Sequence, residues 1–212
     1  MVDLDVVVVA SGEGPTLTLP PAGSVVAADG GLLRARELGL AVDLVVGDLD
    51  SVAPEALAAA EEAGARIVRH PPAKDATDLE LAFDEALALG ARRVLLVASA
   101  SGRLDHLLGS LLLLGSERYS GLALDAFVGD AVLHVVRGER TLAGAPGELL
   151  SLFALGGPAT GVTTEGLEYP LTGETLEPGT TRGVSNVFTR TDARVVLDSG
   201  VLLVVRPEGA RR

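Results

Sequence analysis

The sequence predicts an α/β domain built on an open parallel sheet, followed by a small all-β domain. Up to about residue 137, short and nearly continuous aliphatic runs alternate with Ala/Leu-rich stretches. Beyond that point the helical period disappears, and clusters of Gly, Pro and Thr separate short strand-like runs. A chain of 212 residues is long enough for two modest domains. We therefore assign residues 1–137 to the α/β domain and residues 138–212 to the all-β domain.

The first domain should alternate strands and helices. Its aliphatic runs lack polar alternation, as expected of parallel strands that are covered on both faces. The expected strands are Leu4–Ala10, Val25–Ala28, Leu44–Val46, Arg66–Val68 and Val94–Ala98, and the expected helices are Leu32–Leu38, Pro54–Ala63, Asp78–Leu89 and Leu104–Leu114. Thr77 and Glu80 fit a capping box at the start of the third helix.

The second domain should contain strands only. Its expected strands are Glu148–Leu155, Val187–Thr191, Arg194–Leu197 and Val201–Arg206. A domain of this size and pattern fits a sandwich or a meander.

The composition excludes several classes of function. The chain has 29 acidic and 17 basic residues and a formal net charge of −12, which argues against a nucleic-acid partner. The absence of cysteine excludes disulfides, thiolate nucleophiles and Cys-ligated zinc. No window approaches the ~18 consecutive apolar residues of a membrane span, and the N-terminus lacks a signal-peptide pattern. We therefore expect a cytoplasmic protein with no membrane partner.

Acidic loops follow four of the predicted parallel strands. In an open α/β sheet, ligands bind where the carboxyl ends of the strands open into loops. Carboxylates crowded at one edge repel each other unless a cation lies between them, and Mg²⁺ suits carboxylate and phosphate oxygens. The four loops are Asp29-Gly30-Gly31, Gly47-Asp48-Leu49-Asp50-Ser51, Lys74-Asp75-Ala76-Thr77-Asp78 and Ser101-Gly102-Arg103-Leu104-Asp105-His106.

Each aspartate taken alone has a structural explanation. Asp48 and Asp50 suit Asx turns, and Asp78 and Asp105 suit the first turn of a helix. The occurrence of acidic residues at four strand ends favours a metal site instead. Lys74 is the only lysine of the chain, and a compact point charge beside these carboxylates suits a mobile phosphate.

Other ligand-binding motifs are incomplete. No Gly-Lys-Ser/Thr sequence is present, so the chain has no Walker A loop. Gly12-Glu13-Gly14 follows the first strand, but Pro15 and a Thr/Leu/Pro segment come next instead of a helix, so the dinucleotide fingerprint is broken. Asp48-Leu49-Asp50 also has the Asp-x-Asp spacing of metal-dependent glycosyltransferases, and this alternative stays open.

The four loops, in their order and spacing, strongly resemble those of the thiamine pyrophosphokinase family. The second half adds Thr164-Glu165-Gly166-Leu167-Glu168-Tyr169-Pro170-Leu171 and Gly183-Val184-Ser185-Asn186, which resemble the thiamine-side motifs of that family. The resemblance extends from about residue 25 to residue 190. Ser101-Gly102-Arg103 departs from the usual Gly-Gly-Arg, and Tyr169 stands where some members have tryptophan.

The resemblance implies a Rossmann-like first domain, a β-sandwich second domain and a homodimer whose active site lies at the subunit interface. It implies transfer of a pyrophosphoryl group from ATP to the thiamine hydroxyl, with Mg²⁺ as cofactor and AMP as second product. The implied catalytic residues are Asp48, Asp50, Asp75, Asp78 and Asp105, and the implied metal ligands are Asp48, Asp50 and either Asp75 or Asp78. The residues implied to bind the nucleotide are Asp29, Gly30, Gly31, Lys74, Thr77, Arg103 and His106. The residues implied to bind thiamine are Asp105, Tyr169, Ser185 and Asn186.

Two questions stay open at this point. Asp105 can act as a general base or can orient the substrate. The acceptor can also be another alcohol, such as a hydroxymethylpterin. A protein without catalytic activity that senses a nucleotide or thiamine is a third class of function for this chain. A complete set of aspartates argues against the sensor, because binding alone does not need every metal carboxylate.

Overall fold

The computed structural model describes residues 4–208, which form two compact units. Unit 1 contains the chain up to Ser110 together with Gly121–Gly129, and unit 2 contains Leu111–Ser120 together with the chain from Asp130. Unit 1 is an α/β unit and unit 2 is built mainly from antiparallel strands, which confirms the predicted fold class. No helix among the described residues is long and apolar enough to cross a membrane.

Unit 1 is organised around a parallel sheet with the strand order β6-β5-β1-β2-β3-β4. Valine-rich stretches such as Val6–Val9 are buried on both faces, as expected for covered parallel strands. All five predicted strands are present, and β6 is an additional one. The strands are β1 (Leu4–Val9), β2 (Ala22–Ala28), β3 (Leu44–Gly47), β4 (Arg66–Arg69), β5 (Arg93–Ala98) and β6 (Ala123–Val128).

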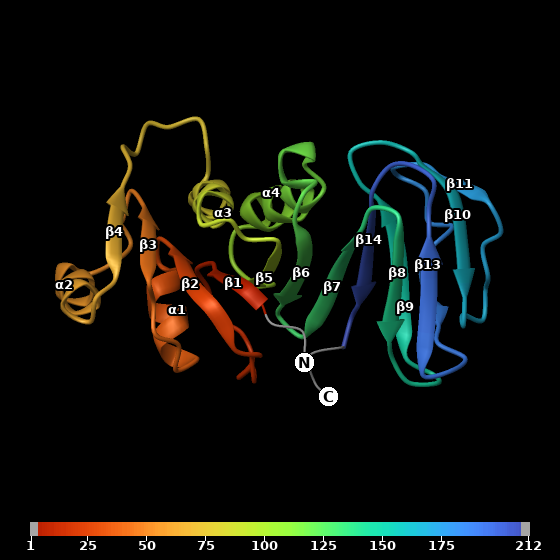
Figure 1. Cartoon of the computed structure of the whole chain (residues 1–212), viewed down its shortest axis with the longest axis horizontal. Coiled ribbons are helices and arrows are strands. Elements are labelled where there is room, and N and C mark those ends of the chain that lie inside the picture. The colour runs from red at the N-terminus through yellow and green to blue at the C-terminus, as the bar shows by residue number, and fades with distance from the viewer. Residues whose placement is uncertain (1–3, 209–212) are drawn as a thin grey trace. The chain divides into compact units, whose positions relative to one another are not determined.

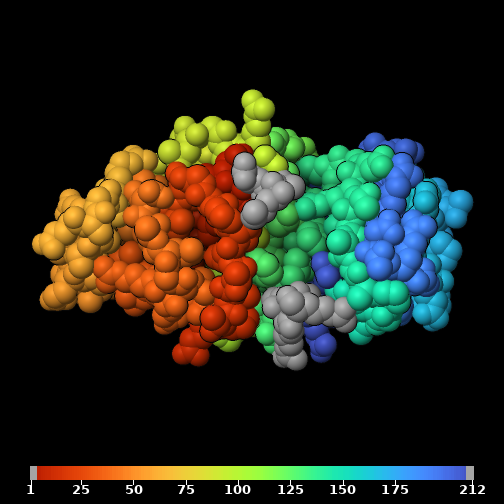
Figure 2. Space-filling model, turned by 60° about the horizontal axis from the view of Figure 1, so that its bottom comes forward, coloured from red at the N-terminus to blue at the C-terminus, as the bar shows by residue number. Residues whose placement is uncertain are grey.

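The four predicted helices are present, with small shifts at their ends. They are α1 (Gly31–Glu37), α2 (Pro54–Glu62), α3 (Asp78–Ala88) and α4 (Leu104–Leu114), and a short 3-10 helix, η1, covers Glu117–Tyr119. Thr77 Oγ1 accepts a hydrogen bond from the Glu80 N–H at 3.2 Å, which confirms the predicted cap of α3. Figure 1 shows α1 and α3 on opposite faces of the sheet. Figure 2 is turned toward the side of unit 1 that carries α1 and α2, in orange to amber.

The connection from β1 to β2 contains no helix, although the two strands are parallel. Leu17 and Leu19 of this connection pack instead against a core that includes Val7, Val25 and Ala35. No helix therefore follows Gly12-Glu13-Gly14, in agreement with the broken dinucleotide fingerprint.

Unit 2 is a sandwich of two antiparallel sheets with the strand orders β12-β9-β14-β7 and β11-β10-β13-β8. One core joins the sheets: Leu150, Leu202 and Val136 from the first sheet pack with Val162 and Val195 from the second. The strands are β7 (Ala131–Val136), β8 (Glu139–Ala143), β9 (Leu149–Ala154), β10 (Ala159–Glu165), β11 (Glu174–Leu176), β12 (Asn186–Val187), β13 (Asp192–Val196) and β14 (Leu202–Arg206).

The predicted strand Val187–Thr191 is much shorter in the structure. Only Asn186 and Val187 pair with β9, and Phe188 makes an isolated bridge to Leu167. The chain therefore changes partner after two residues, which brings the segment before Pro170 next to the segment after Ser185.

Candidate functional site

Three carboxylates converge at the carboxyl edge of the unit 1 sheet. Asp29 follows β2, Asp48 follows β3, and Asp78 begins α3, which comes after β4. One carboxylate oxygen of each lies within 4.8 Å of one oxygen of the other two. All three side chains are half-buried. This is the edge at which parallel α/β sheets bind ligands.

Gly47, the last residue of β3, makes this convergence possible. Its φ is +150°, and a Cβ atom there would lie 2.9 Å from Asp78 Oδ1 and 3.1 Å from Asp29 Cβ. A side chain at position 47 would therefore push the two carboxylates apart.

Backbone strain also marks the predicted motifs. Within residues 4–208, three residues other than glycine have a positive φ: Asp29 at 47°, Leu49 at 63° and Ser185 at 59°. Asp29 belongs to the motif Asp29-Gly30-Gly31, Leu49 to Gly47-Asp48-Leu49-Asp50-Ser51 and Ser185 to Gly183-Val184-Ser185-Asn186. Such conformations cost free energy and gather at functional sites.

Lys74 lies among the carboxylates. Its Nζ is 2.9 Å from Asp48 Oδ2 and 2.9 Å from Asp78 Oδ1. Desolvation opposes the charge on Lys74, but the hydrogen bonds to Asp78 and Asp48 outweigh it, so the pKa of Lys74 lies above its ordinary value. The ammonium group therefore stays charged and neutralises part of the acidic group.

The neighbouring aspartates differ in environment. The hydrogen bond from Lys74 is the main cause that lowers the pKa of Asp48, and the negative charge of Asp48 is the main cause that raises the pKa of Asp50. Asp50 is exposed one residue beyond the buried Leu49. Asp75 is also exposed, and it does not belong to the group of carboxylates that converge. Asp78, the alternative to Asp75 in the sequence prediction, does belong to this group.

The residues fit a hard divalent cation. Asp29 Oδ1 is inaccessible to solvent and accepts no hydrogen bond from the described residues. Its other oxygen accepts a hydrogen bond from Ser51 Oγ. A buried carboxylate oxygen without a donor suits a metal ligand, and Mg²⁺ in proteins takes carboxylate oxygens and completes its shell with water and phosphate.

Arg103 and Asp105 form a separate, exposed pair at the start of α4. Arg103 Nη2 lies 2.6 Å from Asp105 Oδ2, Nε lies 3.2 Å from Oδ1, and the two side chains are 71% and 66% exposed. The hydrogen bonds from Arg103 lower the pKa of Asp105 to about 2. His106 is exposed beside them.

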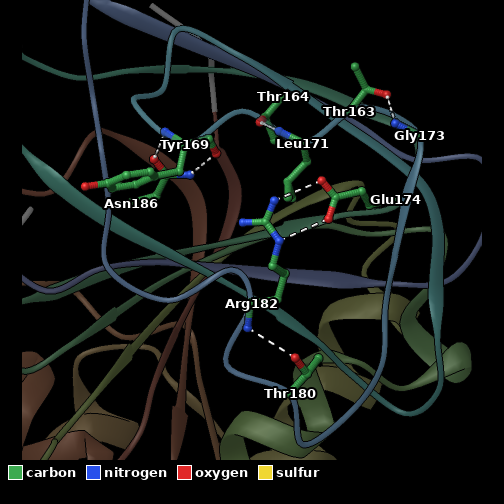
Figure 3. Close-up of polar contacts among 9 residues, drawn as sticks. All are labelled: Thr163, Thr164, Tyr169, Leu171, Gly173, Glu174, Thr180, Arg182 and Asn186. Carbon is green, nitrogen blue, oxygen red and sulfur yellow. Dashed lines mark hydrogen bonds and ion pairs between the residues drawn. The ribbon is translucent and has the colours of Figure 1, made fainter.

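The predicted thiamine-side residues lie in unit 2. Tyr169 is 54% exposed, and its backbone is bonded to the side chain of Asn186 (Figure 3). Ser185 is exposed, and its N–H donates to Ser151 Oγ at 3.1 Å. Asn186 is only 4% exposed. Of the three residues, Tyr169 and Ser185 can present side chains to a ligand, whereas the Asn186 side chain faces the protein.

Three residues that shape these sites were not predicted from the sequence. Gly47 and Ser51 lie inside the predicted motif Gly47-Asp48-Leu49-Asp50-Ser51, so their position in the sequence is a signal that points to them. Ser151 is 34 residues away from Ser185 along the chain and belongs to no motif, so only the pairing of β12 with β9 identifies it.

Comparisons with known proteins agree on one family. The model of the thiamin pyrophosphokinase catalytic domain matches residues 18–124, and the model of the thiamin pyrophosphokinase vitamin B1 binding domain matches residues 133–202. Thiamine pyrophosphokinase 1 of Oryza sativa subsp. japonica is 25% identical over 177 residues, which cover 77% of this chain and 65% of the rice protein. The chain thus spans slightly less than two thirds of that relative.

Solved structures are similar over nearly the whole chain. A thiamin pyrophosphokinase family protein from Enterococcus faecalis has a TM-score of 0.82 and 27% identity, with 95% of this chain and 98% of that chain covered. Thiamin pyrophosphokinase from Geobacillus thermodenitrificans has a TM-score of 0.79 and 26% identity, with 96% and 97% covered.

Proposed function

The chain belongs to the thiamin pyrophosphokinase family, and on this basis we propose that it transfers a pyrophosphoryl group from ATP to the hydroxyl of thiamine. The observation that carries the proposal is the convergence of Asp29, Asp48 and Asp78 around Lys74 within the part of the chain that matches the catalytic domain. Crowded carboxylates beside one mobile ammonium suit a metal-bound triphosphate.

The reaction requires one bond to form and one to break. The thiamine hydroxyl oxygen bonds to the β-phosphorus of ATP, while the bond from that phosphorus to the oxygen bridging the α-phosphorus breaks. AMP leaves with that oxygen, and the hydroxyl proton passes to solvent. Phosphoryl transfer has a loose transition state, so catalysis depends mainly on positioning and on neutralising charge.

The residues of unit 1 would supply the charge neutralisation. Mg²⁺, when bound, shields the negative charge of the triphosphate, and Asp48 and Asp78 with Asp29 or Asp50 would hold it. Lys74 and Arg103 would bind phosphate oxygens. Further contacts to the nucleotide are proposed from Gly30, Gly31, Thr77 and His106.

Asp105 is better suited to orienting thiamine than to taking its proton. Its hydrogen bonds with Arg103 hold its pKa at about 2, so the carboxylate is a weak base at neutral pH. An ionised carboxylate is a good acceptor for the amino group of the pyrimidine ring.

We also propose a homodimer whose active sites lie at the subunit interface. On α4, Leu104, Leu108 and Leu112 follow each other at helical spacing and are 76%, 54% and 56% exposed. Phe153 and Val184 are exposed close in sequence to Ser151 and Ser185. Exposed apolar side chains of this kind are typical of a surface that binds a second protein molecule.

A chromatographic assay tests the proposal. Purified protein is incubated with ATP, Mg²⁺ and thiamine, and both products are quantified, with Asp48→Asn as the inactive control. Thiamine diphosphate with an equal amount of AMP is expected. ADP with thiamine monophosphate would overturn pyrophosphoryl transfer. The absence of any thiamine product would reject thiamine as acceptor, and hydroxymethylpterins and nucleotide sugars would be assayed next.

A further inference from the structure

Asn186 is the only carboxamide side chain of the protein, because the sequence contains no other asparagine and no glutamine. Its Oδ1 accepts hydrogen bonds from the N–H of Tyr169 at 3.0 Å and from its neighbour Val187 at 2.9 Å. Its Nδ2 donates to the Tyr169 carbonyl oxygen at 2.7 Å. Figure 3 shows the amide facing the backbone of Tyr169. Both backbone polar groups of Tyr169 are therefore bound to one side chain.

The amide continues a short backbone ladder. The Thr189 N–H donates to the Gly166 carbonyl and the Glu168 N–H donates to the Val187 carbonyl, each at 2.9 Å, and Leu167 bridges Phe188. The Asn186 side chain extends this pairing by one residue, because its amide bonds the N–H and the carbonyl of Tyr169 as the backbone of a neighbouring strand would. Pro170 comes next and has no N–H to donate, so the ladder cannot continue by backbone pairing alone. The amide thus fixes the last residue before the proline.

The same bonds restrict what else Asn186 can contact. Two N–H groups fill the acceptor capacity of Oδ1, and they also determine which amide atom is oxygen. Asn186 is 4% exposed. One Nδ2 hydrogen bonds the Tyr169 carbonyl oxygen, and the other takes no part in these bonds. The pyrimidine amino group of thiamine is a donor, and Oδ1 has no lone pair left to accept from it.

We infer that Asn186 is a positioning residue, which sets the exposed ring of Tyr169 against the flat cationic substrate and makes no bond to the substrate amino group. This inference rests on the proposed function, because it takes thiamine as the ligand of Tyr169. An aromatic face attracts a flat cation such as the thiazolium ring only when it is held at the right angle and distance. Ser185, which is exposed, is then the residue of this pair that contacts thiamine.

Four variants test the inference. Asn186→Ala removes the clamp, by which we mean the Asn186 amide with its bonds to both backbone groups of Tyr169. Asn186→Asp keeps the size of the side chain but places a carboxylate against the Tyr169 carbonyl oxygen. Tyr169→Ala removes the ring and leaves the backbone bonds. Thr164→Val is the matched control, because the buried Thr164 hydroxyl accepts a comparable bond from the Leu171 N–H at 2.9 Å, two residues from Tyr169.

The first measurement is NMR of the protein without ligand. The chain has two tyrosines and no tryptophan, so labelled tyrosine gives two ring signals, which Tyr169→Phe assigns. We expect both Asn186 variants to shift the Tyr169 signal and to leave that of Tyr119, which is fully buried, unchanged. Thr164→Val should change neither signal. An unchanged Tyr169 signal in both Asn186 variants would overturn the inference.

The second measurement is steady-state kinetics. We expect Asn186→Ala and Asn186→Asp to raise KM for thiamine about tenfold with little change in kcat, the sign of lost binding that the ground state and the transition state share equally. In the Tyr169→Ala background, Asn186→Ala should have no further effect on KM, because a positioning residue acts only through the ring. Additive effects in the double variant would show direct contact with the substrate and overturn the inference.

The two proposals fail in different ways. A wild-type protein that makes no thiamine product would reject thiamine as the ligand and overturn that part of the inference. The shift of the Tyr169 signal in the Asn186 variants, measured without ligand, would still establish the clamp. If Asn186→Ala does not fold, the isosteric Asn186→Asp carries both tests.

Discussion

Replacing Lys74 by methionine should destabilise the protein without metal and strengthen its binding of divalent cations. The ammonium of Lys74 is the cation 2.9 Å from both Asp48 and Asp78, so it occupies the place where a metal would neutralise the same charges. Without it, the carboxylates repel each other. A metal arriving at wild-type protein has to displace Lys74, whereas a metal arriving at the variant does not.

The size of the effect follows from burial. Removing one partner of a fully buried ion pair costs about 3–5 kcal/mol, whereas an exposed pair contributes up to about 1 kcal/mol. The side chains of Lys74, Asp48 and Asp78 are 14%, 15% and 27% exposed, which places this cluster between the two cases. We expect a loss of about 1–3 kcal/mol. In a protein of this length each kcal/mol lowers Tm by about 2–4 °C.

Calorimetry with and without Mg²⁺ measures both effects, and the electron paramagnetic resonance of Mn²⁺ gives the cation affinity directly. Arg66→Met is the matched control, because it also removes one positive charge but breaks an ion pair with Glu85 in which Arg66 is 60% exposed. Lys74→Met should start below wild type and gain more in Tm when Mg²⁺ is added. Equal Tm and equal Mn²⁺ affinity in wild type and Lys74→Met would refute the reasoning.

Three further predictions concern catalysis and assembly. Asp48→Asn should lower turnover by about 10²–10³-fold with the fold intact by circular dichroism, whereas Asp75→Asn should keep most of the activity; near-normal turnover in Asp48→Asn would reject the metal assignment. The pKa of Asp105, about 2, lies below its ordinary value of 3.8, so its contact with Arg103 is fully present above pH 3.8 and is lost only as pH falls through about 2. The pH profiles of kcat/KM for wild type and Asp105→Asn should therefore run parallel between about pH 5 and 9. A fall in kcat/KM at low pH that is present only in wild type would instead identify Asp105 as a base. Leu108→Glu should shift the protein toward the monomer in analytical ultracentrifugation, whereas Leu89→Glu, at a position that is 52% exposed outside α4, should not; a dimer unaffected by Leu108→Glu would exclude α4 from the interface.

The sequence predicted unit 1 well because its strands and helices have strong local patterns. The strands β1, β2, β3 and β5 each contain a run of consecutive aliphatic residues, and a Thr cap marks the start of α3. β6 was missed because Ala123–Val128 alternates buried and less buried residues and contains Asp125. In unit 2, β8 was missed because Glu139–Ala143 is largely exposed and charged, and β10 because the left-handed Gly161 interrupts it. Such strands are determined by their partners in the sheet rather than by their own residues.

The same contrast holds for the candidate site. The convergence of Asp29, Asp48 and Asp78 follows from the parallel sheet, because the carboxyl ends of all its strands lie at the same edge. That Asp78 rather than Asp75 lies in this group did not follow from the sequence. It depends on Gly47, whose missing Cβ leaves room for the Asp78 carboxylate, and on Lys74, which reaches that carboxylate from the same loop.

Ser185 and Asn186 show most clearly why neighbouring residues of one motif can differ in role. Asn186 is the first residue of β12 and is buried, whereas Ser185 precedes the strand in a left-handed conformation and is exposed. A motif read from the sequence therefore assigns both residues to the ligand, whereas the pairing of β12 separates them into one that can touch the substrate and one that holds Tyr169. The double variant of Asn186 and Tyr169 measures that separation, because only the residue that touches the substrate keeps an effect once the ring is gone.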